Sequence, residues 1–185
     1  MNVLTWIIVA VVVVVVGWLL TIYNSLVRRR NQVKEAWSDI DVQLKRRYDL
    51  IPNLVTTVKG YAAHEREAFE SVTAARSAAM GAKTPAEHAQ TENMLSSALK
   101  SLFAVAEAYP DLKANTNFLE LQRELSDTEN KIQAARRFYN TNVRDYNTAI
   151  ESVPTNIVAK SFGFAPQEYF ELEDEAAKNA PNVAF

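Results

Sequence analysis

The feature that most constrains this chain is an apolar run near its start, VLTWIIVAVVVVVVGWLLTIY, at residues 3–23. As a helix rising about 1.5 Å per residue, the run extends roughly 30 Å, the thickness of the hydrocarbon core of a bilayer. Trp6 lies near one end and Trp18 and Tyr23 near the other, where amphipathic rings favour a membrane interface. A cleaved signal peptide would have a basic start, a shorter apolar run and a small-residue cleavage site, and this segment has none of the three. We therefore predict a transmembrane anchor over residues 1–27.

Three consecutive arginines, Arg28, Arg29 and Arg30, follow the run directly, and no lysine or arginine precedes it. Basic residues beside a membrane span mark its cytoplasmic end. The sequence therefore predicts a single-pass protein with its N-terminus outside and its C-terminal domain in the cytoplasm.

The segment after the anchor is basic although the chain as a whole is not. Residues 28–47 contain seven basic and three acidic residues, whereas the whole chain has a net charge of −2. That overall charge does not favour nucleic acid as a partner. A basic cluster beside the membrane attracts anionic lipid head groups by about 1 kcal/mol per charge, although the arginine triplet alone would serve to set the topology. The predicted head-group ligands are Arg28, Arg29, Arg30 and Lys34.

Apolar residues beyond the anchor recur every three or four positions, which is the spacing of amphipathic helices. The first stripe keeps one phase across Pro52. We predict one helix over about residues 28–80, bent where Pro52 lacks a backbone donor and crowds the Tyr48 carbonyl. The alternative is that Asp49 caps a restarted helix, with Pro52 in its first turn.

Start and stop signals divide the rest of the chain. Gly81 suits the left-handed conformation that ends many helices, and Thr84 with Glu87 matches a capping box. Asn117 with Glu120 repeats that pattern. The signals predict helices at about residues 28–80, 85–108, 117–153 and 156–161, the last stopped by Gly163 and followed by an aromatic strap, FGFAPQEYF.

The predicted fold is therefore all-α. A single N-terminal transmembrane helix precedes an antiparallel bundle of amphipathic helices. The bundle has three long helices and a short C-terminal one. The predicted domains are the anchor at 1–27, the bundle at 28–170 and a flexible acidic tail at 171–185.

Long stretches of the sequence resemble the LemA family of bacterial membrane proteins. They include YNSLVRRRNQVKEAWSDIDVQLKRRYDLIPNLV, VKGYAAHE, YPDLKANTNFLELQRELSDTENKIQAARRFYN and VRDYNTAIESVPTNIVAKSFGF. The resemblance covers almost the whole chain. It implies a membrane span followed by a bundle of long antiparallel helices, here in the bacterial cytoplasmic (inner) membrane. It does not imply a reaction, since LemA-like proteins have no agreed enzymatic activity and one branch is associated with forming intracellular membrane compartments.

The side chains offer little for catalysis. The chain has no cysteine and four scattered glycines, so thiol chemistry, thiolate metal sites and glycine-rich phosphate loops are not expected. Two neighbouring acidic residues would point to opposite sides of a helix, and two histidine–glutamate pairs each supply only two metal ligands. We therefore predict no catalytic residue, no metal site, no cofactor and no enzymatic activity. The acidic pair is Asp39 with Asp41, and the histidine–glutamate pairs are His64 with Glu67 and His88 with Glu92.

Three asparagines in the third predicted helix, Asn140, Asn142 and Asn147, have two possible roles. They are either buried polar residues that fix the helix register or surface amides on a tyrosine-rich face.

Helix lengths give the last prediction. A first helix of roughly 80 Å is longer than the second helix and its linker, which together extend about 60 Å. Its membrane-proximal turns are then left without a partner within the chain, and an exposed apolar stripe marks an interaction surface. These residues are Val33, Trp37, Ile40 and Leu44.

We therefore predict a homo-oligomer formed through this stripe. The predicted function is that of a non-enzymatic, self-assembling scaffold that organises or remodels the membrane, with anionic lipids as partners. The alternative is a membrane-tethered adaptor whose helical bundle docks an unidentified partner protein.

Overall fold

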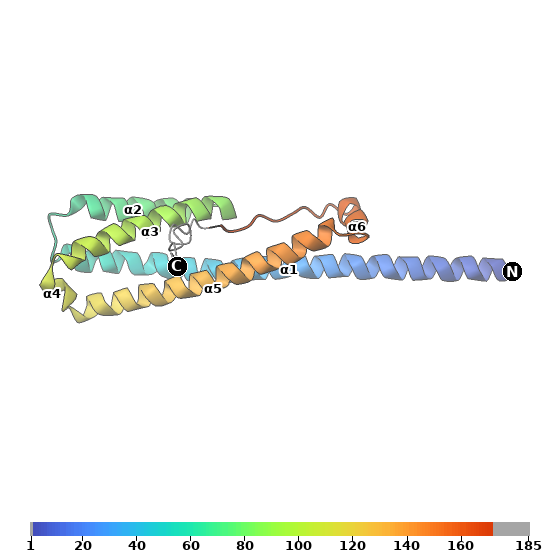
Figure 1. Ribbon diagram of the computed structural model, residues 1–185, viewed down its shortest axis with the longest axis horizontal. Helices are drawn as coiled ribbons and strands as arrows, with labels where there is room; N and C mark the ends of the chain where they lie inside the picture. The colour runs from blue at the N-terminus through green and yellow to red at the C-terminus, as the bar shows by residue number, and fades with distance from the viewer. Residues whose placement is uncertain (1, 172–185) are drawn as a thin grey trace, which may run out of the picture. The chain divides into compact units, whose positions relative to one another are not determined.

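The computed structural model describes residues 2–171, so the predicted tail lies outside the described residues beyond Glu171. Within that range the chain is helical with irregular connections and has no strand, which confirms the all-α prediction (Figure 1). The helices are α1 (Val3–Lys59), α2 (Arg66–Gly81), α3 (Pro85–Glu107), α4 (Pro110–Lys113), α5 (Thr116–Glu151) and α6 (Thr155–Ser161).

The described residues divide into two compact units. Unit 1 comprises the residues up to Ile40 together with Ala135–Glu168, and unit 2 comprises Asp41–Ala134 and the residues from Tyr169 onward. Both α1 and α5 contribute one part to each unit.

The first helix continues through Pro52, as the continuous-helix prediction has it; the bend stays a prediction. A proline at this position cannot donate to the carbonyl of Tyr48, four residues earlier. That carbonyl accepts a hydrogen bond from Nε of Arg76 in α2 at 2.7 Å instead. The proline therefore frees a carbonyl that ties α1 to α2 within unit 2.

A double-mutant cycle tests this link. Arg76→Ala should lower the free energy of unfolding by about 1–3 kcal/mol, because the Tyr48 carbonyl loses its partner. In a Pro52→Ala background, the new N–H can bond that carbonyl, so the same substitution should cost less. Pro52→Ala alone should stay folded with equal or higher helicity. The measurement is chemical denaturation followed by circular dichroism, with exposed Arg66→Ala as the control, and equal costs of Arg76→Ala in both backgrounds would contradict the link.

The predicted single helix over 28–80 is wrong beyond residue 59, since the chain turns between α1 and α2. The turn at 60–65 is held by backbone hydrogen bonds from Tyr61 and Ala62 to the carbonyl of Val58. The contact of Arg76 with Tyr48 shows that α2 runs back antiparallel to α1 in unit 2. The predicted left-handed end at Gly81 is also wrong, because only Gly163 has a positive φ among the described residues, and α2 ends on extended Ala82 instead.

The other helix ends follow the sequence signals closely. Thr84 and Glu87 form the predicted capping box at the start of α3. The cap of α5 is Asn115, whose side-chain oxygen accepts from the N–H of Phe118 at 3.0 Å, rather than Asn117. Helix α6 begins at Thr155 and is followed by Gly163 at φ 69°, so its predicted stop is confirmed.

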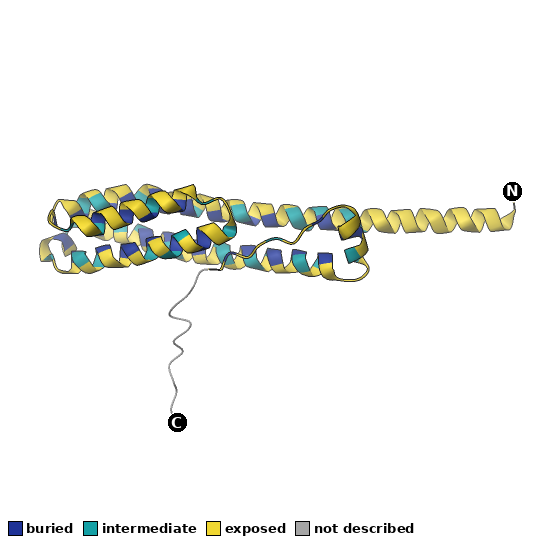
Figure 2. Ribbon diagram, turned by 90° about the horizontal axis from the view of Figure 1, so that it is seen from above, coloured by how far each residue is buried: buried dark blue, intermediate teal, exposed yellow. Residues whose placement is uncertain are grey.

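In unit 1, α5 runs antiparallel along α1. Arg29 lies opposite Asp145, and eight residues further along α1 the ring of Trp37 packs against Tyr139, six residues earlier in α5. The ring centroids of Trp37 and Tyr139 are 5.2 Å apart. Figure 2 shows buried residues along both helices in this region.

The predicted unpartnered stripe is therefore covered within the chain. Val33, Ile40 and Leu44 are buried and Trp37 is half-buried, so the premise that they lack an intramolecular partner is wrong. The reason is the turn at 60–65, which adds one chain reversal. With that reversal α5, and not α3, is the helix that returns along the first part of α1.

Candidate functional site

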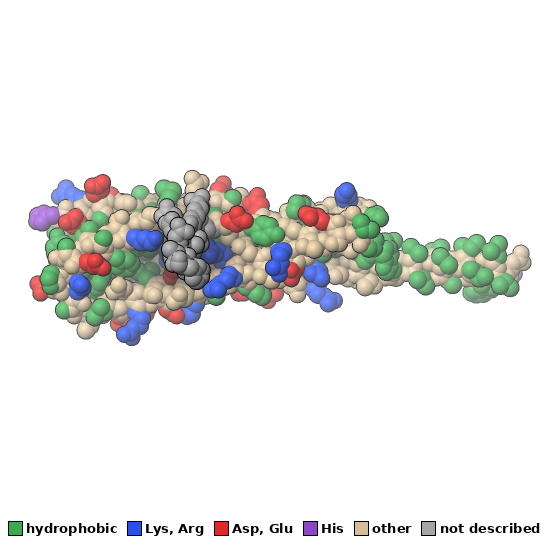
Figure 3. Space-filling view, viewed as in Figure 1, with side chains coloured by type: hydrophobic (Ala, Val, Ile, Leu, Met, Phe, Trp, Pro, Cys, Tyr) green, Lys and Arg blue, Asp and Glu red, His purple; other side chains and the backbone are tan. Residues whose placement is uncertain are grey.

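The first candidate site is the end of unit 1 from which the apolar part of α1 extends. Helix α1 contains a stretch with a mean hydropathy of 2.9, long and apolar enough to cross a membrane. Its side chains from Val3 to Leu20 are exposed on all faces (Figures 2 and 3). A stretch of this kind suggests a single-pass membrane anchor.

Three aromatic rings meet where this exposed stretch joins the packed part of unit 1. We call Tyr23, Phe162 and Phe164 the aromatic collar. The ring of Tyr23 lies 5.0 Å from that of Phe162 and 5.7 Å from that of Phe164, both edge-on. The left-handed backbone of Gly163 lets the chain reverse between the two phenylalanines, and the N–H of Phe164 donates to the Ala159 carbonyl at 2.9 Å.

After the collar, residues 165–168 form an irregular strap that side chains of α5 hold. The hydroxyl of Tyr146 donates to the Ala165 carbonyl at 3.0 Å, and that of Tyr139 donates to the Glu168 carbonyl at 2.8 Å. Burial raises the pKa of Tyr139 to about 12 and raises that of Tyr146, so both hydroxyls keep the proton that they donate.

Asn147 gives the strap its most specific contact. Its side-chain amide donates to the Gln167 carbonyl and accepts from the Gln167 N–H, both at 2.9 Å. Asn142, by contrast, is half-buried and donates to the Phe138 carbonyl of its own helix. Asn147 thus holds the strap, a role that differs from both of those considered for these asparagines.

The four predicted head-group ligands differ in their surroundings. Arg28 and Lys34 are exposed. Arg29 donates to the Asp145 carbonyl at 3.5 Å, and the Arg30 guanidinium lies 5.1 Å from the centre of the Phe164 ring. Two of the four therefore also hold unit 1 together, and lipid contact stays a prediction for all of them.

The second candidate site is a buried polar cluster in unit 2. Arg47 and Glu92 are 4% and 1% exposed, and Nη1 of Arg47 lies 3.0 Å from Oε2 of Glu92. The other nitrogen, Nη2, donates to the hydroxyl of Ser96 at 2.8 Å. The Tyr48 hydroxyl donates to the second oxygen of Glu92, and Glu129 approaches Arg47 at 3.2 Å.

Burial dominates the electrostatics of this cluster. It raises the pKa of Glu92, against the lowering effects of Arg47 and of the Tyr48 hydrogen bond. It also raises the pKa of Tyr48, so the phenol remains a donor. Arg47 thus contacts side chains from both α3 and α5, which suits a role in fixing how these helices pack around α1.

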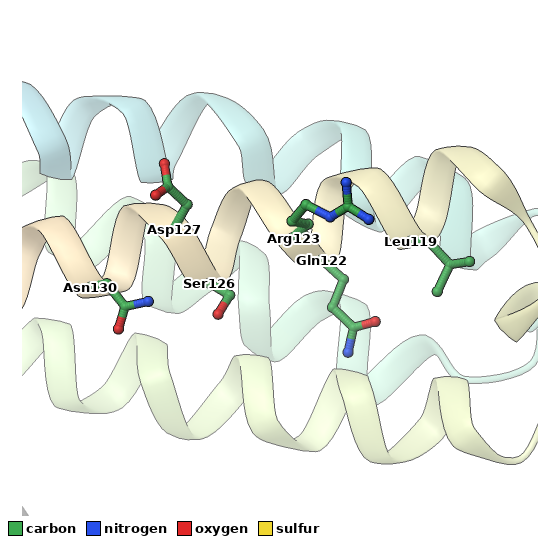
Figure 4. A pocket seen from close by; sticks show the side chains of 6 residues that line it. All are labelled: Leu119, Gln122, Arg123, Ser126, Asp127 and Asn130. Carbon is green, nitrogen blue, oxygen red and sulfur yellow. The ribbon is translucent and has the colours of Figure 1, made fainter.

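Three surface hollows of unit 2 are lined by residues outside the cluster. The surface hollow shown in Figure 4 is lined by side chains of α5 alone, and two others lie along α2, α3 and the turn between them. None of these three hollows is lined by Arg47, Tyr48 or Glu92. Over residues 2–171, no group of three or more histidine, aspartate or glutamate side chains could hold a metal ion. The residues in Figure 4 are Leu119, Gln122, Arg123, Ser126, Asp127 and Asn130.

Sequence reasoning missed the buried cluster. It counted Arg47 among the basic residues near the membrane and weighed Glu92 only as a metal-ligand partner of His88. The available signal was helical phase, since Arg47 lies three residues after buried Leu44 and four before buried Ile51. Glu92 likewise precedes buried Leu95 by three residues.

The chain is similar in sequence to known proteins. The model of the LemA family matches residues 36–185. The protein LemA of Metamycoplasma hominis is 29% identical over 155 residues, covering 82% of this chain and 69% of that protein. The magnetosome protein MamQ of Magnetospirillum gryphiswaldense is 26% identical over 178 residues, covering 82% and 65%. MamQ 2 of Paramagnetospirillum magneticum is 26% identical over 186 residues, covering 86% and 68%. The chain thus spans about two thirds of the length of these relatives.

Proposed function

Because the chain belongs to the LemA family, we propose that it is a non-enzymatic scaffold anchored in the bacterial cytoplasmic membrane. The observation that carries this proposal is the continuity of α1. Its exposed apolar stretch and its packed part in unit 1 form one helix without a break. No flexible linker separates the anchor from unit 1. The orientation of unit 1 is therefore coupled to that of the membrane span.

Two further observations support a role in organising membrane. Two of the relatives are magnetosome proteins by name, and the family resemblance links one branch to intracellular membrane compartments. The buried pair of Arg47 and Glu92 joins helices α1 and α3 of unit 2, which suits the structural part of a scaffold.

A scaffold holds either copies of itself or other proteins. The stripe from which self-assembly was predicted is buried, so the proposal of self-assembly does not use that surface. The burial of the stripe supports the adaptor alternative, because a tethered monomer must cover its apolar stripe within its own chain. Mass photometry of the detergent-solubilised full chain separates the two: several copies support self-assembly, whereas a single-chain mass supports the adaptor.

The proposed orientation is tested by cysteine labelling, since the chain has no cysteine of its own. Ser126 is exposed in α5, so Ser126→Cys should react with a membrane-impermeant maleimide only after lysis. Asn2→Cys, on the other side of the proposed span, should react in intact spheroplasts. Labelling of the Ser126→Cys protein without lysis would reverse the topology.

A further inference from the structure

We propose that α6 and the loops that flank it form a second contact with the bilayer, at its surface and beside the span. This proposal rests on the membrane anchor proposed above. The contact surface consists of Val153, Ile157 and Phe162, which we call the interfacial patch. Its ligand is the head-group and upper acyl region of lipid.

The position of the patch comes from the aromatic collar. Tyr23 is the last residue of the apolar run, so it marks the level at which the helix leaves the hydrocarbon. Phe162 packs on Tyr23 with ring centroids 5.0 Å apart. Figure 1 shows α6 beside this part of α1, within unit 1. The patch therefore lies at the level of the membrane surface when α1 spans the bilayer.

The side chains of the interfacial patch are large and apolar, yet they are mostly exposed. Val153, Ile157 and Phe162 are 79%, 64% and 63% exposed, although all three are large and apolar and lie within ten residues of one another. Val158 and Ala159 face inward and hold α6 on unit 1, so the opposite face of this helix is the one presented outward. Single exposed apolar residues are common on protein surfaces, but a group at one end of a unit marks an interaction site.

The neighbouring charges fit lipid as the occupant. Lys160 is exposed one turn from Ile157, and Arg28 is exposed on α1 a turn beyond Tyr23. Glu151 is the acidic group at the start of this segment. Apolar side chains with lysine or arginine beside them are typical of segments that lie in the interface, where the apolar groups enter the acyl boundary and the cations reach the phosphates.

The test uses the full chain in vesicles that contain anionic lipid. An environment-sensitive fluorophore is attached to Ile157→Cys, or in a second variant to Val153→Cys, both at exposed positions. We expect blue-shifted emission that is lost with lipids carrying a quencher near the head group and is insensitive to iodide in the water. The matched control is Phe138→Cys, an exposed aromatic position in the same unit. It adjoins Tyr139, which packs on Trp37, about 21 Å along α1 from Tyr23, so its label should respond to iodide alone.

A label at Val14→Cys, in the middle of the apolar run, separates the two proposals. If it is quenched by lipids with a deep quencher while both patch labels respond to iodide, the anchor stands and the interfacial contact is wrong. If the patch labels are shielded from iodide and from every lipid quencher, protein covers the patch and the lipid proposal is wrong. If the Val14 label responds to iodide, the membrane anchor itself is wrong.

Discussion

Ile40→Glu should unfold unit 1 rather than dissociate an assembly. The Ile40 side chain is 0% exposed, so the substitution removes a buried apolar group and places a carboxylate where water cannot reach it. We expect a loss of about 4 kcal/mol or more in the free energy of unfolding, at the high end for single substitutions. The measurement is denaturation of the full chain in detergent, followed by circular dichroism.

Val42→Glu is the matched control, two residues further along the same helix. Its side chain is 63% exposed, so the same chemical change should cost little there. The result also separates the two interpretations of the apolar stripe. If Ile40→Glu instead keeps the helicity and melting temperature of the wild type and lowers only the oligomeric mass, the stripe joins different chains and the intramolecular packing is wrong.

Arg47→Met should have the second largest effect, because it leaves Glu92 buried without its cation. Breaking a buried pair from one side costs about 3–5 kcal/mol, whereas replacing both partners by apolar groups is often close to neutral. Arg47→Met with Glu92→Met should therefore recover most of the stability that Arg47→Met loses. A double variant no more stable than Arg47→Met would show that the pair contributes no coupling of this kind.

The cost of Arg47→Met should also depend on pH. Arg47 is the main group that lowers the pKa of Glu92 against the effect of burial, so its removal raises that pKa further above the ordinary value of 4.5. An acid whose pKa is raised by folding takes up a proton more readily in the folded state. The variant should therefore regain stability relative to the wild type as the pH falls through the folded pKa toward 4.5, and lose it as the pH rises. A cost that stays constant from neutral pH to 4.5 would contradict the buried carboxylate.

The parts of the fold that follow from local chemistry could be predicted from the sequence. The apolar run of α1 needs only length and the absence of charge, and the capping box of Thr84 and Glu87 needs only two side chains at fixed spacing. The stop after α6 needs one glycine that can adopt a positive φ. Each of these depends on residues that are close in sequence.

The turn at 60–65 could not be predicted in the same way, and the error spread from there. The apolar stripe keeps its phase through Val58 and Ala62, and Gly60 is the one local break signal. A missed reversal changes the direction of every later helix, so the predicted helix over 85–108 returns along α1 where the structure has α5. Helix lengths alone then predict an uncovered stripe from Val33 to Leu44, whereas helix periodicity correctly places these residues on one face.

The candidate sites, too, depend on contacts between residues that are far apart in sequence, which the sequence alone does not predict. The collar and the strap depend on pairs far apart in sequence, such as Tyr23 with Phe164 and Asn147 with Gln167. Arg47 and Glu92 lie in phase with buried neighbours, which periodicity could have shown, but their pairing requires the packing of α1 against α3. Charge counting alone assigns such an arginine to the surface.

The closure of unit 1 by residues from both ends of the described chain sets an order for its biosynthesis. Arg29 and Asp145 are 116 residues apart in sequence, and the collar joins positions still more distant. The ribosome releases the apolar run first, long before the second half of α5, α6 and the strap exist. Unit 2, whose residues up to Ala134 form one uninterrupted segment, can then fold while the stripe on α1 still awaits its cover. During that interval Val33 and Ile40 lack the cover that buries them in the folded chain, so we expect the nascent chain to be most open there to a chaperone or to a neighbouring nascent chain.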